Sequence, residues 1–181
     1  MNNPLPDPTY VTSLEELFWG ATLIAITMTM HGFGMVSIQR VTGAVKERLA
    51  RTPSFLSGMS VLVLTSWLIL LVHLLEVFAW CGFFYWKDAV NTQTNTPATA
   101  SLCYYFALMD YTTLGSDFNL HIRWRLLEGM IAVAGLLTFA WSTGVLLALA
   151  QDFQDQELQL LKQRRARKHS QPQPPNPAAP V

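Results

Sequence analysis

The residues whose types and spacing best suggest chemistry lie in the segment SLCYYFALMDYTTLGSD, residues 101–117. The segment begins with aromatic residues and ends in a run of small and hydroxyl-bearing residues around Gly115. About a dozen residues is too short to cross a bilayer as a helix, which requires about 20 residues. Irregular backbone at membrane depth occurs only where protein buries it or where it lines a watery cavity. Since a long hydrophobic segment lies on each side, the pattern predicts a re-entrant pore loop, a short helix followed by a polar loop.

Two titratable residues, His73 and Glu76, lie in or beside the hydrophobic segment that precedes this loop. They are three residues apart and therefore share one face of a helix. Because charged side chains at membrane depth are costly and are usually paired, we predict a His73–Glu76 pair that faces protein and supports the loop from behind. A role in proton sensing or gating is the alternative, and an enzymatic role is a third.

A further histidine, His31, lies in the first hydrophobic segment. It is either a neutral imidazole hydrogen-bonded to a neighbouring helix or a proton or metal site. Counted from Arg40, its depth is about 14 Å, whereas His73, counted from Pro53, lies at about 30 Å, at about 1.5 Å per residue. We therefore expect that the two histidines do not meet and that they share no metal site.

The composition is that of a membrane protein. Charged residues make up 13% of the 181 residues, against about 25% in soluble domains. Stretches of 22, 24 and 23 residues without a formal charge occupy residues 17–38, 52–75 and 129–151. Each is long enough to cross about 30 Å of hydrocarbon as a helix. We therefore expect an all-α membrane protein with three transmembrane helices.

The distribution of Lys and Arg predicts how the chain is oriented. Four basic residues follow the first span, namely Arg40, Lys46, Arg48 and Arg51. The cluster KQRRARK, residues 162–168, follows the third span, and residues 1–16 contain no Lys or Arg. Because basic residues concentrate in cytoplasmic loops, we predict a multi-pass protein of the cytoplasmic membrane with its amino terminus outside and its carboxyl terminus in the cytoplasm. The basic cluster either contacts anionic membrane lipids or simply marks the inner side.

Two stretches resemble a known family of ion channels. The sequence YYFALMDYTTLG, residues 104–115, resembles the pore helix and the start of the filter in the potassium-channel-type pore domain with two transmembrane helices, whose filter reads TVGYG followed by an acidic residue. The sequence WRLLEGMIAVAGLLTFAWSTGVLLAL, residues 124–149, resembles the inner helix of that family, with Gly135 at the place of the gating hinge glycine. The likeness covers about residues 56–150. It is closest to small bacterial ion-channel proteins that have one extra helix before the pore.

The resemblance implies a homotetramer in which backbone carbonyls from four chains replace the hydration shell of a potassium ion. In this arrangement Thr112 and Thr113 supply the inner hydroxyl and carbonyl ligands. Leu114 replaces the usual valine, and Gly115 matches the first glycine of the filter. The permeant cation would bind at Thr113, Leu114 and Gly115, and no other metal is expected.

The filter pattern then changes. Ser116 occupies the place of the family's tyrosine and Asp117 that of its second glycine, unless the loop is one residue shorter and Asp117 is the terminal acid. We therefore expect relaxed selectivity for potassium, while a ring of Asp117 carboxylates still favours cations over anions. Asp110 and Tyr111, at the end of the short helix, are expected to support the filter together with the histidine–glutamate pair.

The expected organisation is an extracellular lead-in (residues 1–13), a peripheral transmembrane helix (14–40), a cytoplasmic loop (41–53), a pore domain (54–150) with its pore loop at 99–118, a cytoplasmic basic helix (151–168) and a disordered tail (169–181). We expect passive conduction of potassium and sodium ions, with a non-conducting structural or sensory membrane subunit as the alternative. The sequence predicts no enzymatic activity, organic cofactor, nucleic-acid partner or small-molecule substrate. Cys81 and Cys103 either form a disulfide or pack as small apolar residues.

Overall fold

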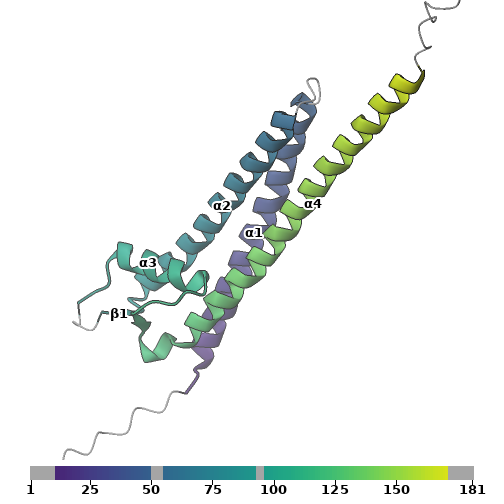
Figure 1. Ribbon diagram of the computed structural model, residues 1–181. Helices are drawn as coiled ribbons and strands as arrows, with labels where there is room; N and C mark the ends of the chain where they lie inside the picture. Colours follow the sequence, from purple (N-terminus) through teal and green to yellow (C-terminus); the bar gives the residue numbers. More distant parts are fainter. Residues whose placement is uncertain (1–10, 50–54, 93–95, 171–181) are drawn as a thin grey trace, which may run out of the picture.

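The computed structural model describes residues 11–49, 55–92 and 96–170, and most of them are helical. The elements in chain order are α1 (Leu14–Leu49), α2 (Phe55–Trp86), β1 (Val90–Asn91), α3 (Ala100–Tyr111), β2 (Asn119–Leu120), η1 (Ile122–Trp124) and α4 (Leu126–Ser170). Three helices, α1, α2 and α4, are long and apolar enough to cross a membrane. In Figure 1, α1 and α2 form a hairpin, α4 lies alongside α1, and α3 lies near the end of the bundle where α4 begins. This architecture is consistent with an all-α membrane protein.

Helix α1 ends later than the sequence suggests. The Ser13 hydroxyl accepts a hydrogen bond from the N–H of Glu16 at 3.1 Å, which caps the first turn. At the other end the helix continues to Leu49, so most of the predicted loop, residues 41–53, is helical. Basic side chains are favourable in the last turn of a helix, so the charges that follow the apolar stretch do not end it. The prediction of a loop was wrong there because it used charge to mark the end of the helix.

Helix α3 descends along α2. At its first residue, the carbonyl oxygen of Ala100 lies 3.7 Å from the sulfur of Cys81. At its last residue, the Tyr111 hydroxyl lies 2.9 Å from Nδ1 of His73. Since His73 precedes Cys81 by eight residues, α3 reaches about 12 Å deeper along α2. The chain then returns, because β2 pairs antiparallel with β1, which closely follows the end of α2.

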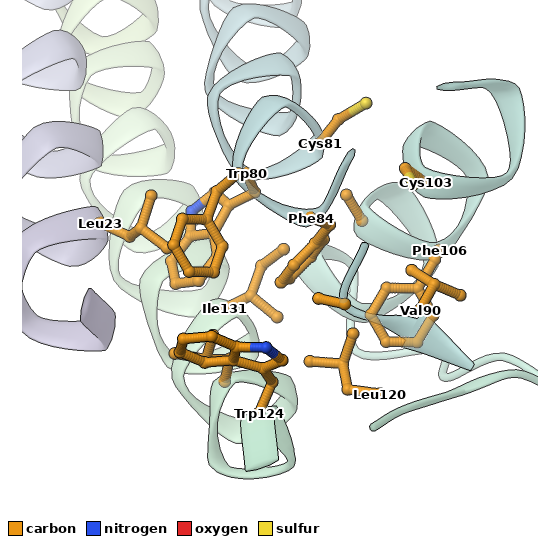
Figure 2. Packing of buried hydrophobic residues seen from close by; sticks show 14 of the residues in the cluster. Leu23, Trp80, Cys81, Phe84, Val90, Cys103, Phe106, Leu120, Trp124 and Ile131 are labelled. Atoms are coloured by element: carbon orange, nitrogen blue, oxygen red, sulfur yellow. The ribbon is translucent and has the colours of Figure 1, made fainter. Parts of the chain in front are cut away.

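The largest group of buried apolar residues surrounds α3. Trp80 and Phe84 of α2 and Phe106 of α3 meet there and are at most 1% exposed (Figure 2). Cys81 and Cys103 belong to the same cluster as free, buried thiols, so they pack as small apolar residues. In membranes, close van der Waals contact of this kind is a main source of helix association. The cluster therefore fixes the position of α3 between α2 and α4.

Gly135 lets α4 approach the end of α3 closely. A Cβ atom at this position would lie 2.0 Å from the carbonyl oxygen of Tyr111. Small residues at helix contacts allow backbones to come this near. This close contact accounts for a glycine at position 135. Helix α4 is continuous through this position, and the role of Gly135 as a gating hinge stays a prediction.

We predict that Gly135→Ala destabilises the protein by about 1–3 kcal/mol, the usual cost of inserting a methyl group into a packed site. The clash is with a backbone atom, which cannot rotate away. Gly144→Ala in the same helix is the matched control, because a Cβ there meets nothing within 4 Å. Thermal unfolding of both variants in detergent micelles measures the difference. Equal transition temperatures would show that α3 and α4 are not in contact at Gly135.

Candidate functional site

Six polar side chains converge inside the helix bundle, and each is at most 5% exposed. They come from all four helices and are His31 of α1, His73 and Glu76 of α2, Tyr111 of α3, and Thr138 and Ser142 of α4. We call this group the polar cluster. Because polar groups inside a membrane are expensive and usually functional, the polar cluster is the first candidate site.

Glu76 is at the centre of the polar cluster. Its Oε1 lies 2.9 Å from Nδ1 of His31, and its Oε2 accepts a hydrogen bond from the Tyr111 hydroxyl. His73 is also near, with Nδ1 at 3.4 Å from Oε2. The pair that the spacing of His73 and Glu76 predicts is therefore present, but His31 on another helix is the closer partner. Both carboxylate oxygens are thus satisfied, as a buried charge requires.

The two imidazoles are oriented in the same way. Nδ1 of His73 lies 2.9 Å from the Tyr111 hydroxyl. On the opposite side of each ring, Nε2 faces the Ser142 hydroxyl, at 3.0 Å for His73 and 3.4 Å for His31. Tyr111 in turn makes a hydrogen bond with Thr138. Both Nδ1 atoms therefore face the carboxylate, that of His73 faces the phenol as well, and both Nε2 atoms face α4.

The prediction that His31 and His73 do not meet was wrong. Their ring centroids are 5.3 Å apart. The depth of His31 was counted from Arg40, whereas α1 continues to Leu49. Measured from the ends that join α1 to α2, each histidine lies 18 residues into its helix, a depth of about 27 Å for both.

The backbone that follows α3 forms a helix cap. The N–H of Thr113 donates to the carbonyl of Asp110 at 3.0 Å, and the N–H of Leu114 donates to that of Met109 at 3.0 Å. These two bonds define a Schellman motif, in which glycine normally occupies the left-handed position. Here Thr113 has a φ of +62°. A β-branched residue in this conformation is strained, by about 1–3 kcal/mol.

The rest of the predicted filter segment is exposed except for Ser116, which is half-buried. Gly115 has a φ of +73°, so positive φ recurs at alternate residues, Thr113 and Gly115. The Leu114 side chain between them is 74% exposed. Ser116 donates a hydrogen bond to the carbonyl of Phe118 at 2.9 Å, and Asp117 is exposed. The segment thus places its backbone on the surface of a single chain.

Asp110, the other residue expected to support the filter, lies outside the polar cluster. Its side chain is buried, and Oδ2 has no hydrogen-bond partner among the residues that the structure describes. The structure therefore brings together three of the four predicted supporting residues, Tyr111, His73 and Glu76, and leaves Asp110 apart.

Sequence reasoning did not include Thr138 and Ser142 in the site, although a signal was present. They are four residues apart in a long apolar helix and therefore lie on one face. The spacing of His73 and Glu76 gave the same kind of signal on α2. The contact with His31, 45 residues away from Glu76, has no such local pattern.

No protein-family model, curated protein or solved structure matches this chain. The resemblance of residues 56–150 to a channel family therefore stays a prediction. The site has to be interpreted from its own geometry.

We predict that Tyr111→Phe destabilises the protein by about 1–3 kcal/mol, because it leaves buried partners without a hydrogen bond while the ring still fills its space. Tyr105→Phe is the control, since Tyr105 is an exposed residue of the same helix. Thermal unfolding in detergent gives both values. A loss no greater for Tyr111→Phe than for Tyr105→Phe would mean that the hydroxyl is not part of the network.

Proposed function

We propose that this chain is the pore-forming subunit of a homotetrameric cation channel that conducts potassium and sodium ions by passive diffusion. One observation carries the proposal. A helix too short to span a membrane descends between two long apolar helices, and the loop after it exposes Thr113, Leu114 and Gly115. This is the layout expected of a pore helix followed by a filter.

The exposure of the loop favours assembly around a pore. Irregular backbone at membrane depth must be covered by protein or must line a water-filled cavity. Among the residues that the structure describes, none covers this loop in a single chain, because Leu114 is 74% exposed and Thr113 and Gly115 are exposed beside it. Copies arranged around an axis would enclose the loops in a shared aqueous path. One loop per chain requires about four copies, as in the filters built from four loops.

The charges near the loop favour cations. The carboxyl end of α3 carries partial negative charge, and its last residue leads directly into the loop. Asp117 is exposed after it and would form a ring of carboxylates in a tetramer. Because Ser116 and Asp117 take the place of the family's tyrosine–glycine pair, the outer part of the filter is less constrained, which accounts for conduction of both ions.

The polar cluster gives the loop a fixed starting point. Tyr111 immediately precedes Thr112 and is hydrogen-bonded to Glu76, which also lies near His31 and His73. We assign filter support to Tyr111, His73 and Glu76 on this basis. We propose that Asp110, whose Oδ2 has no partner among the described residues, accepts a hydrogen bond from a neighbouring subunit.

In this proposal the protein lies in the cytoplasmic membrane with the β1–α3 connection outside and the carboxyl end of α4 inside. We predict that a membrane-impermeant maleimide labels Thr92→Cys in intact cells and labels Glu157→Cys only after permeabilisation. The wild-type chain is the control, because its two thiols are buried. The opposite labelling pattern would reverse the orientation.

Flux measurements from liposomes test the channel itself. We predict that the purified wild-type protein passes both potassium and sodium under matched gradients. The double variant Ser116→Tyr, Asp117→Gly should have a ratio of potassium flux to sodium flux several-fold higher than the wild type. The reason is that it restores the tyrosine–glycine pair of the family's filter. Asp155→Asn, a change at an exposed residue of α4, is the control for altered charge. Absence of flux from every variant would favour a non-conducting structural or sensory subunit.

A further inference from the structure

We infer that the polar cluster is a binding site for a divalent transition-metal ion, with His31, His73 and Glu76 as ligands and Tyr111 as a fourth donor. The inference does not depend on channel activity, since metal binding is measured on the protein without any ion flux. It concerns the interior of the bundle and not the exposed loop.

The donor atoms already have nearly the right separations. The ligating atoms of His31, His73 and Glu76 all lie within 4.8 Å of one another. Individual pairs are 2.9 Å apart for His31 Nδ1 and Glu76 Oε1, and 3.4 Å apart for His73 Nδ1 and Glu76 Oε2. Ligands about 2.0–2.1 Å from a tetrahedral ion are about 3.3–3.4 Å from each other. The two close pairs involve different oxygens of Glu76. To surround one ion, the widest pair of donors has to close from as much as 4.8 Å to about 3.4 Å.

The fourth donor completes a tetrahedral set. The Tyr111 hydroxyl lies 2.9 Å from Nδ1 of His73 and is hydrogen-bonded to Glu76. Coordination would release its proton, since metal ligands bind in their deprotonated form. The carboxylate of Glu76 and the phenolate of Tyr111 would then balance the two charges of the ion.

The surrounding hydrogen bonds are those that a metal site requires. A metal-binding imidazole normally uses its second ring nitrogen to bond an outer group, which fixes the tautomer and the ring orientation. Ser142 faces Nε2 of both His31 and His73. The Thr138 hydroxyl lies within hydrogen-bond distance of Tyr111 and of the backbone carbonyls of Ala134 and Gly135. It would donate its single proton to Tyr111 once the phenol is deprotonated. Three of the four donors, His31, His73 and Tyr111, therefore have partners outside the coordination sphere.

The donor types indicate the class of metal. Two imidazoles with a carboxylate and a phenol suit zinc, iron(II), manganese(II) or copper(II), whereas calcium and magnesium prefer sites made of oxygen alone. Complete burial of His31 and Glu76 also favours an ion bound without its hydration shell. Zn²⁺ and Co²⁺ are therefore suitable probes.

A cavity beside the polar cluster provides a route of access. It has a volume of about 670 Å³ and lies among α1, α2 and α4. Trp141 lines this cavity, and its ring centroid is 5.4 Å from that of His31. Lys46 and Asp152 also line the cavity, and they form an ion pair with each other at 2.7 Å. Rotation of the Trp141 side chain would bring the cavity up to the His31 ring.

The test uses the full chain purified in detergent and measures metal per chain after incubation with Zn²⁺ and removal of the excess. We expect one zinc ion per wild-type chain, a rise in transition temperature with zinc, and the visible absorption of four-coordinate cobalt with Co²⁺. His31→Gln and His73→Gln should lose all three signals. His121→Gln, a change at an exposed histidine outside the cluster, should keep them.

Ser142→Ala keeps the test decisive if the histidine variants do not fold. Loss of an outer hydrogen bond to metal-binding imidazoles weakens metal affinity by about 10–100-fold, so this variant should bind zinc weakly while remaining folded. Zinc uptake that is absent in the wild type, or equal in the wild type and the folded cluster variants, would overturn the inference. The polar cluster would then be a hydrogen-bond network alone.

Discussion

The structure depends on how one buried carboxylate is satisfied. Glu76 lies in α2, a helix with a mean hydropathy of 2.3 across its span, and a carboxylate at such a depth costs about 3 kcal/mol or more. Its closest donors come from other helices, because His31 belongs to α1 and Tyr111 belongs to α3, whereas His73 of α2 lies farther away, at 3.4 Å. Hydrogen bonds to a charged group contribute about 1.5–3 kcal/mol each. Their sum offsets the cost only when α1 and α3 are in register with α2, so the carboxylate selects one arrangement of the helices.

The same interaction fixes where the exposed loop begins. The hydroxyl of Tyr111 is held by Glu76 and Thr138, while its carbonyl oxygen packs against Gly135 of α4. The side chain and the backbone of Tyr111 are thus both held in place. The strained conformation of Thr113, two residues later, is maintained because the helix that it caps cannot move away. A mobile α3 would relieve this strain by unwinding its last turn.

Local patterns in the sequence predicted the parts of this arrangement that depend on neighbouring residues. Apolar lengths predicted the three spanning helices, and the short segment before Thr112 predicted α3. Spacing of three residues predicted that His73 and Glu76 pair. Contacts between helices were harder to predict, because they depend on the residue at which each helix ends. Helix α1 continues nine residues beyond Arg40, which changes the depth of His31 by about 14 Å. This difference explains why His31 and His73 were predicted to lie far apart although they are adjacent.

The backbone conformation of the loop after α3 could not be predicted from local sequence patterns, for a different reason. The sequence TTLG is compatible with an extended filter strand and with a helix cap. In a single chain the cap is favoured because it gives the carbonyls of Met109 and Asp110, at the end of α3, hydrogen-bond donors that the helix itself does not supply. A ligand that binds only the folded polar cluster would stabilise this starting geometry by an amount that grows with the logarithm of its concentration relative to its Kd. Tyr111 connects the polar cluster to the loop. If a ligand in the polar cluster changed the affinity of the loop for an ion, the ion would change the affinity for that ligand by the same factor, because such coupling is reciprocal.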